Sequence, residues 1–275
     1  MRNIELIALD LDGTLVSPAG YQISKENLDA LERARQQGVR IVINTGRPPE
    51  YCWKLTDYIS FEGELIVNCG SRILEMPSRE TLAKDVIPLD ACKKYLSYCA
   101  DKGIMVLLCV EDKAYITESD LKKLRAYTEH VHTNNVFRNV VENFDEILAQ
   151  HPDDIDKVEA FAPKELLDEL GEWVKENLPE LLGNRTGSKV LELCSATAGK
   201  GSTLRMLAER LNIPRERVMA VGDSGNDLNM FEYAGLSVAM GGSPAHVVAH
   251  CHEVTGTLEE HGVAMAIEKF VLKHR

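Results

Sequence analysis

Apolar runs that end in acidic residues or glycine mark the first third of the chain. The run Ile4–Leu9 has the composition of a buried strand, and it stops at Asp10-Leu11-Asp12-Gly13-Thr14. Ser24 is placed as the N-cap of a helix whose apolar stripe ends at Gly38. Val39–Ile43 and Leu65–Val67 are further apolar runs of strand length. Strands that alternate with helices in this way predict a parallel sheet with right-handed crossovers.

The last third of the chain repeats this alternation. Its predicted elements are a helix from about Lys200 to Leu211, a strand at Val218–Val221, a polar loop at Gly222–Asp227, a strand at Leu236–Met240 and a closing helix from His261 to Lys273. These elements belong with those of the first third in one parallel sheet.

The middle of the chain has a different pattern. A tight turn at Glu111–Lys113 separates two apolar runs, and a second hairpin is predicted across Asn184–Ser188. No element is predicted in the polar stretch from His130 to Pro152. Because hairpins imply antiparallel pairing, we expect an α/β core with a doubly wound parallel sheet, formed by residues 1–85 and 189–275. Residues 86–188 then form an inserted α+β domain.

Composition narrows the classes of partner. The 275 residues are 44% hydrophobic and carry a formal net charge of −12, which argues against nucleic acid as the main partner. A small anionic substrate in a locally positive pocket remains compatible with this charge. The apolar runs fall short of the ~20 residues that a membrane span needs, and the first run contains Glu5, unlike a secretory signal. Seven cysteines without a Cys-x-x-Cys spacing indicate a reduced, cytoplasmic protein.

The first aspartates are the strongest chemical signal. Side chains at i and i+2 of a strand lie on one face, so Asp10 and Asp12 repel each other unless a cation lies between them. A loop with two solvated aspartates is the alternative. Three further segments also follow a strand or begin a helix, namely Thr45-Gly46, Gly199-Lys200-Gly201 and Gly222–Asp227. Open α/β sheets bind ligands at that edge, where helix N-termini and glycine turns offer N–H groups to an anion.

The charges of these segments suggest the ligand. Four carboxylates (Asp10, Asp12, Asp223 and Asp227) beside a phosphate dianion require a divalent cation and positive side chains. Mg²⁺ fits, because it prefers carboxylate oxygens and bridges to phosphate. Lys200 offers a flexible positive charge to a nucleophilic carboxylate and a phosphate, and Thr45 offers a hydroxyl beside the amide of Gly46.

In this order and context, the four segments resemble the four motifs of the haloacid dehalogenase-like (HAD) phosphotransferases. The insertion between the second and third motifs resembles the type IIB cap of the Cof-type phosphatases. The resemblance spans nearly the whole chain and includes two late segments, Val238–Gly241 and Gly262–Ala264. It implies a HAD core, similar to a Rossmann fold, with a cap that sets substrate specificity.

The resemblance also implies a role for each residue that matches a motif. Asp10 is the implied nucleophile and forms an aspartyl-phosphate, while Asp12 is the general acid/base and gives its backbone carbonyl to the metal. Asp223 is an implied direct Mg²⁺ ligand, with Asp227 behind it. The implied substrate-binding residues are Thr45, Gly46, Lys200 and Asn226. The chain departs from the family pattern at Cys69-Gly70, where Asn-Gly is usual, and at Gly242, where Asn is usual.

We therefore expect a Mg²⁺-dependent phosphatase that hydrolyses small phosphorylated metabolites, most naturally sugar phosphates. A phosphomutase with the same aspartyl-phosphate is one alternative. A phospho-accepting or metabolite-sensing module without catalysis is another, although Asp12 counts against it because such a module needs no general acid/base. His246, His250 and His252 do not have the spacing of a second metal site. The sequence indicates neither the leaving group nor the oligomeric state.

Overall fold

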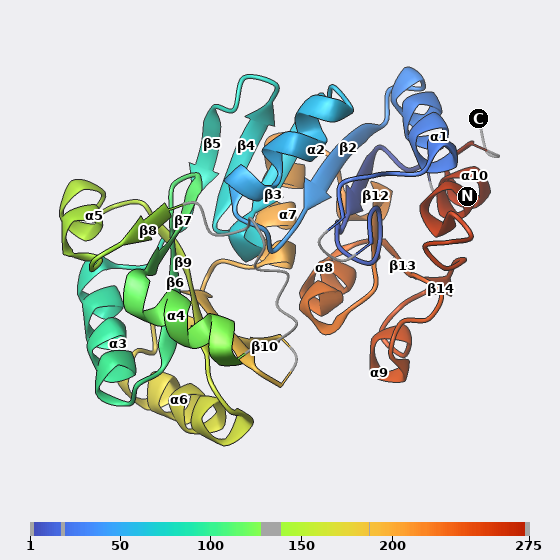
Figure 1. Cartoon of the computed structure of the whole chain (residues 1–275). Helices are drawn as coiled ribbons and strands as arrows, with labels where there is room; N and C mark the ends of the chain where they lie inside the picture. The colour runs from blue at the N-terminus through green and yellow to red at the C-terminus, as the bar shows by residue number, and fades with distance from the viewer. Residues whose placement is uncertain (1–2, 18–19, 128–138, 187, 273–275) are drawn as a thin grey trace. The chain divides into compact units, whose positions relative to one another are not determined.

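The computed structural model describes residues 3–17, 20–127, 139–186 and 188–272 (Figure 1). By their contacts, the residues form two compact units. The first comprises Met1–Gly46, Lys54–Ala83 and Gly199–Arg275, and the second comprises Arg47–Trp53 and Lys84–Ala198. The domain limits given above, at 85/86 and 188/189, stay a prediction.

An eight-stranded sheet forms the centre of the first unit. Its strand order is β14-β13-β12-β1-β2-β3-β4-β5. The bounds are β1 (Leu6–Leu9), β2 (Arg40–Asn44), β3 (Gly63–Val67), β4 (Arg72–Met76), β5 (Thr81–Lys84), β12 (Val218–Gly222), β13 (Leu236–Ala239) and β14 (Glu253–Val254). The pairs from β14 through β3 are parallel, as the alternating pattern predicts.

One edge of this sheet departs from the parallel pattern. Strand β4 pairs antiparallel with β3, and β5 follows it at the edge. Only the turn η2 (Asn68–Gly70) and Ser71 separate β3 from β4, which is too short for a parallel crossover. The sequence pattern predicts no strand for β4 or β5.

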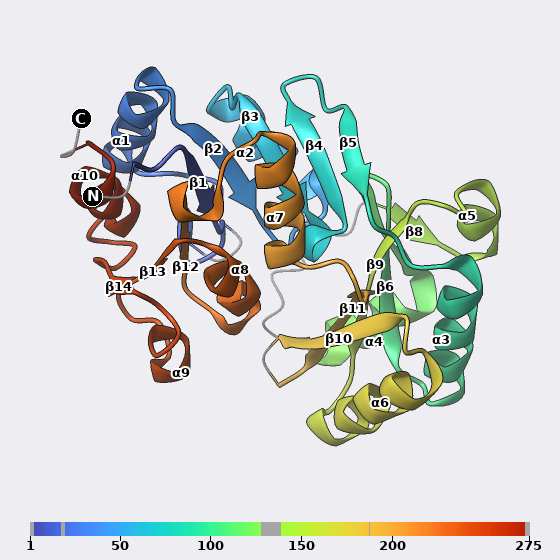
Figure 2. The same cartoon turned by 180° about the vertical axis from the view of Figure 1, so that it is seen from behind.

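Helices cover both faces of the eight-stranded sheet. Figures 1 and 2 show α2 in front of one face and α7 in front of the other, which is the doubly wound arrangement expected. The helices of this part are α1 (Lys25–Gln36), α2 (Trp53–Tyr58), α7 (Lys200–Arg210), α8 (Leu228–Tyr233), α9 (Ala245–Val248) and α10 (Gly262–Phe270), with short turns η3 (Arg215–Arg217) and η4 (Gly225–Asp227). Ser24 caps α1, since its side chain accepts a hydrogen bond from Asn27 N–H, which confirms the predicted N-cap.

The second unit is built on a six-stranded sheet with the order β10-β11-β9-β6-β7-β8. Its strands are β6 (Met105–Val110), β7 (Lys113–Thr117), β8 (Asn139–Val141), β9 (Ile155–Phe161), β10 (Leu181–Thr186) and β11 (Val190–Ser195). All the pairs are antiparallel except β7 with β8. Both predicted hairpins are present, β6–β7 and β10–β11, although residue 187 of the second turn lies outside the described residues.

Two helices cover one face of the six-stranded sheet. Buried side chains of α3 (Leu89–Asp101) and α6 (Lys164–Asn177) pack against alternate residues of the strands, including Val158, Ala160 and Leu193. Because side chains alternate along a strand, Lys157, Glu159 and Glu192 belong to the opposite face. The remaining helices are α4 (Glu118–Tyr127) and α5 (Asp145–Gln150). Strand β8 and helix α5 lie in the polar stretch for which the sequence pattern predicts no element.

A short segment that follows Gly46 packs with the second unit. It contains the turn η1 (Pro49–Tyr51), whose Glu50 N–H donates to the carbonyl of Asp112 at 2.9 Å. The Glu50 carboxylate accepts hydrogen bonds from Ala114 N–H at 2.7 Å and from the amide of Asn139 at 3.1 Å. Glu50 therefore fastens the segment 47–53 to strands β7 and β8.

Among the described residues, every cysteine is a free thiol. None of the helices in the described ranges has both the length and the apolar composition to cross a bilayer.

Candidate active site

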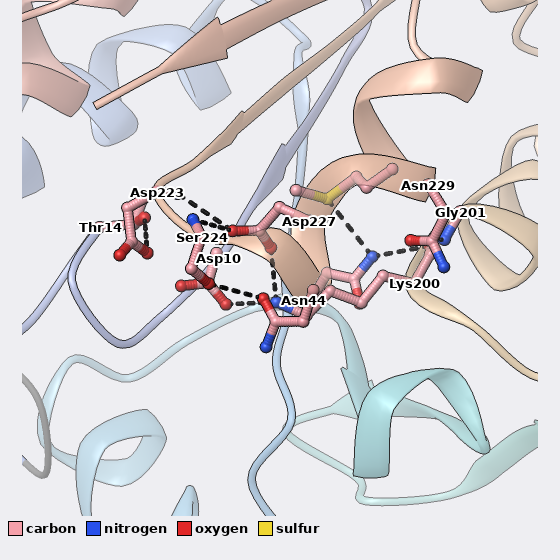
Figure 3. Close-up of polar contacts among 11 residues, drawn as sticks. Asp10, Thr14, Asn44, Lys200, Gly201, Asp223, Ser224, Asp227 and Asn229 are labelled. Carbon is pink, nitrogen blue, oxygen red and sulfur yellow. Dashed lines mark hydrogen bonds and ion pairs between the residues drawn. The ribbon is translucent and has the colours of Figure 1, made fainter. Parts of the chain in front are cut away.

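The first predicted aspartate lies at the carboxyl end of β1. Asp10 is only 4% exposed, and its N–H donates to Val221 O of the neighbouring strand β12 at 2.9 Å. Strand β12 ends at Gly222, so Asp223 leaves the sheet beside Asp10. Thr14 Oγ1 donates to Asp223 Oδ1 at 3.3 Å and links the two loops (Figure 3).

The conformation of Gly13 permits this close approach. Gly13 has a φ of +85°, and a Cβ placed on it would lie 2.6 Å from Asp223 Oδ2. A side chain at residue 13 would therefore be strained and would displace the Asp223 carboxylate. The glycine of the first motif is thus required by the position of an aspartate in the fourth.

Asp227 organises the loop that carries Asp223. Its Oδ2 accepts hydrogen bonds from the N–H groups of Asp223 at 3.0 Å and Ser224 at 3.1 Å. Ser224 and Asp227 form a reciprocal capping box around the turn η4. Asp227 is fully buried, so its carboxylate is held in one orientation with Oδ1 directed away from the loop backbone.

Lys200, the first residue of α7, connects these carboxylates. Its Nζ lies 2.5 Å from Asp10 Oδ1 and 2.7 Å from Asp227 Oδ1 (Figure 3). Burial alone lowers the pKa of Lys200, but the two carboxylates outweigh it and the pKa lies above its usual value. The lysine is therefore a fixed positive charge inside the site.

Two of the carboxylates are difficult to ionise in the protein alone. Burial raises the pKa of Asp10 to about 8, with Lys200 opposing and Asp227 reinforcing the shift. Burial and the charge of Asp227 raise the pKa of Asp223 to about 6. A cation bound to these carboxylates would stabilise the site, because it favours their ionised forms.

The donor set fits a hard divalent cation. Carboxylate oxygens of Asp10, Asp223 and Asp227 lie within 4.8 Å of one another. With all three carboxylates ionised, this group and Lys200 have a net charge of −2, which a divalent cation neutralises. Oxygen ligands of this kind suit Mg²⁺. The side chain of Asp12 is not part of this group, so the four predicted metal residues are not all brought together by their carboxylates.

The other predicted residues lie in the segments that follow β1, β2 and β12. Thr45 is buried after β2, where its N–H donates to Ile66 O at 2.8 Å, and its carbonyl accepts from Cys69 N–H at 3.2 Å. Gly46 is half-buried beside it. Asp12 is half-buried, and its backbone forms an isolated β-bridge with Val16. Asn226 is exposed in η4, and its Oδ1 accepts a hydrogen bond from Ser224 Oγ at 2.8 Å.

The two departures from the family pattern have defined conformations. Cys69 is buried with a φ of +59°, between Asn68 at +51° and Gly70 at +102°. Gly242 also has a positive φ, of +89°, in the loop after β13. Within the described ranges, no cysteine or histidine lies close enough to the three aspartates to be a further metal ligand.

The three C-terminal histidines do not form a metal site among the described residues. His252 Nδ1 lies 2.7 Å from Ser237 Oγ, and His250 Nδ1 lies 2.7 Å from the carbonyl of His246. Each of these contacts is local to the β13–α9–β14 region.

Three residues near the site were not identified from the sequence. They are Thr14, which bonds to Asp223, Ser224, which forms the capping box with Asp227, and Asn44, which bonds to Lys200. The capping box has a readable signature, Ser-x-x-Asp after an apolar run. The contacts of Thr14 and Asn44 join residues more than 150 positions apart, and no local pattern indicates them.

Comparison with known proteins gives the family. The model of the family described as haloacid dehalogenase-like hydrolase matches residues 7–267, a range that includes every residue of the site. The chain belongs to this family of hydrolases. The resemblance found in the four motifs is thereby confirmed.

Similar proteins extend over almost the full length. Phosphatase YwpJ of Bacillus subtilis is 33% identical, with 95% of this chain and 98% of that protein covered. The 5-amino-6-(5-phospho-D-ribitylamino)uracil phosphatase YitU of Bacillus subtilis is 28% identical, with 96% and 97% covered. A haloacid dehalogenase-like hydrolase from B. subtilis has a TM-score of 0.84 at 28% identity, with 98% and 100% covered.

A solved structure also relates to the predicted cap type. The HAD subclass IIB sugar phosphatase BT4131 has a TM-score of 0.79 at 25% identity, with 97% of this chain and 98% of that chain covered. Together these likenesses make the chain a phosphatase of the HAD family with a cap domain. The alternative of a module without catalysis is set aside.

Proposed function

We propose that this phosphatase hydrolyses small phosphate monoesters, sugar phosphates in particular, through a phosphorylated Asp10 and with bound Mg²⁺. The observation that carries the proposal is the group of Asp10, Asp223 and Asp227, whose carboxylate oxygens lie within 4.8 Å of one another while Lys200 contacts two of them. The subclass IIB relative is a sugar phosphatase by name, and YitU acts on a phosphorylated ribityl compound by name.

Asp10 is the nucleophile in this proposal. Lys200 lies against its Oδ1 and favours the ionised carboxylate, which leaves the other oxygen to attack phosphorus. The ester oxygen departs from phosphorus as the aspartyl-phosphate forms. The same lysine, the Thr45 hydroxyl and the N–H group of Gly46 offset the charge of the transferring phosphoryl group.

Asp12 transfers the proton. As a general acid it protonates the departing ester oxygen, and as a general base it then takes a proton from the water that attacks the aspartyl-phosphate. It is half-buried and lies two residues beyond the nucleophile. When bound, Mg²⁺ supplies charge neutralisation between the carboxylates and the phosphate.

We infer that the second unit selects the leaving group. On the face of its sheet that α3 and α6 leave uncovered, Lys157 Nζ lies 2.5 Å from Glu159 Oε1 and 3.4 Å from Glu192 Oε1. Glu159 and Glu192 are directly opposite each other on β9 and β11. Lys157 offsets the repulsion between these two carboxylates, and carboxylates and ammonium groups are suited to hydrogen bonding with a polyhydroxylated group.

Two properties of the whole chain complete the proposal. The net charge of −12 favours a small phosphorylated metabolite over nucleic acid as the partner. Free thiols at all seven cysteines agree with the reducing conditions of the cytoplasm.

The test is a screen for release of inorganic phosphate. Wild type and Asp10→Asn, purified in parallel, are incubated with Mg²⁺ and a panel of phosphorylated sugars, polyols and nucleotides. We expect wild type to release phosphate from sugar or polyol phosphates, and Asp10→Asn to show only background. Equal release by both proteins would mean that Asp10 is not the nucleophile. Release from nucleotides alone would overturn the substrate class but not the chemistry.

A further inference from the structure

A buried amide lies behind the catalytic lysine. Asn44 is the last residue of β2 and is fully buried. Its Nδ2 donates to the backbone carbonyl of Lys200 at 2.9 Å and touches Met230 Sδ at 3.5 Å (Figure 3). Its Oδ1 has no hydrogen-bond partner in the described part of the chain. The side chain thus reaches from the central sheet to the first turn of α7.

The amide is costly for stability alone. A buried carbonyl oxygen without a partner loses its hydration and gains nothing in return, so an apolar side chain of similar shape is expected to fold at least as well. The contact to the Lys200 carbonyl is therefore the feature that an apolar residue here cannot reproduce.

Other contacts hold the same turn of α7, but at other residues. Thr203 Oγ1 donates to Gly70 O at 2.6 Å, and Gly201 N–H donates to Asn229 Oδ1 at 3.2 Å. A Cβ on Gly70 would lie 2.4 Å from the backbone of Gly199, so the chain segments are in close contact there. Asn44 adds the bond to the backbone of Lys200 itself.

Asn44 also precedes Thr45 in the chain. The strand end that carries Thr45 is therefore joined by one side chain to the residue whose Nζ contacts Asp10 and Asp227. A shift of Lys200 relative to Thr45 would break this bond.

We propose that Asn44 is a positioning residue, which fixes the backbone of Lys200 so that its ammonium group is held between Asp10 and the phosphoryl group. This inference rests on the proposed function, in which Lys200 acts on the nucleophile. Misplacement of a catalytic group by about 1 Å can cost about 10²-fold in rate, so the loss of one such bond is measurable in kcat.

The test is a double-mutant cycle of Asn44→Leu with Lys200→Met, measured as kcat and KM on an aryl phosphate with Mg²⁺. In the wild-type background we expect Asn44→Leu to lower kcat about 10- to 100-fold, with KM changed less than about three-fold. In the Lys200→Met background the same substitution should change the residual kcat less than about two-fold, because no ammonium group remains to be positioned.

Asn27→Leu is the matched control. Asn27 is another fully buried asparagine of the first unit, with one bond, from Ala264 N–H to its Oδ1 at 2.9 Å, and an unpartnered Nδ2 among the described residues. Its substitution removes a comparable buried amide and should leave kcat unchanged. Asn44→Leu should lower kcat at a similar melting temperature, so a general loss of packing is distinguished from a positioning effect.

The outcomes separate the two proposals. If Lys200→Met keeps the wild-type kcat, the role of Lys200 in the proposed function fails. If Lys200→Met is impaired but Asn44→Leu costs the same factor in both backgrounds, or nothing in either, the positioning role is overturned. Should Lys200→Met not fold, the comparison of Asn44→Leu and Asn44→Ala with Asn27→Leu decides, and an unchanged kcat in the Asn44 variants overturns the inference.

Discussion

Lys200 Nζ and Asp227 Oδ1 lie 2.7 Å apart, and the two side chains are 1% and 0% exposed. Since Asp10 shares the same ammonium group, one buried cation serves two buried carboxylates. Removing one partner from a buried ion pair leaves an uncompensated charge, which is more costly than the pair is favourable.

We therefore expect Lys200→Met to destabilise the protein strongly. The free energy of unfolding should fall by about 3 kcal/mol or more at pH 8 without metal, measured by urea denaturation. Lys25→Met removes an exposed i,i+4 partner of Asp29 and should cost far less, because solvent screens that pair. Equal losses in the two variants would contradict the buried charge arrangement.

Chelation should abolish activity. Because the three carboxylates and Lys200 carry a charge of −2 once all the carboxylates are ionised, a phosphate dianion cannot bind productively until a divalent cation neutralises the group. EDTA should remove hydrolysis of an aryl phosphate, and excess Mg²⁺ should restore it. Full activity in excess chelator, with metal content verified by elemental analysis, would rule out the metal.

Substitutions of Asp10 and Asp12 should impair different steps of the reaction. Asp10→Asn removes the nucleophile and should lower kcat by several orders of magnitude. Asp12→Asn should lower it about 10²–10⁴-fold and accumulate the aspartyl-phosphate, because the base for the second step is lost. Mass spectrometry after an acid quench should then find phosphate on Asp10. Phosphate on Thr45 or Ser224 would identify another nucleophile.

The metal-free protein should lose stability as the pH rises. The pKa of Asp10 is raised from 3.8 to about 8 and that of Asp223 from 3.8 to about 6, so the folded state binds more protons than the unfolded state in these windows. The raised pKa values of Asp10 and Asp223 therefore lower the free energy of unfolding as the pH increases, by up to about 1.4 kcal/mol per pH unit for each proton.

Urea denaturation in chelator between pH 5 and 8 measures this dependence. Asp10→Asn should flatten the decline, and saturating Mg²⁺ should reduce it, because the cation lowers both pKa values. If the stability of wild type and Asp10→Asn depends on pH in the same way in chelator, the prediction that Asp10 has a raised pKa is wrong.

Glu192→Gln should change the choice of substrate. If the carboxylates beside Lys157 bond to the leaving group, kcat/KM for the best sugar phosphate should fall about 10-fold, while that for an aryl phosphate changes less than about three-fold. Glu172→Gln, an exposed change on α6, is the control. An unaltered ranking across the metabolite panel in Glu192→Gln would remove this cluster from substrate selection.

The parts of the fold that the sequence predicted are those with strong local patterns. Strands β1 and β12 are short apolar runs, and each is followed within two residues by an aspartate of the site, which is why Asp10 and Asp223 were recognisable. Strand β8 has three residues and α5 buries little beyond Leu148, so neither has a periodic pattern to detect. The β4–β5 hairpin includes Pro77, which weakens a strand prediction. The bond from Asn44 to Lys200 spans 156 positions and depends on the fold itself.

The bonds of Glu50 have a consequence for protein engineering. Because segment 47–53 packs with the second unit, the chain passes from one unit to the other in four places, after residues 46, 53, 83 and 198. A chimera that exchanges only residues 84–198 with a relative would separate Ala114 and Asn139 from the carboxylate that accepts their hydrogen bonds. Grafts of substrate preference between these phosphatases should therefore carry the heptapeptide after Gly46 together with the larger insert.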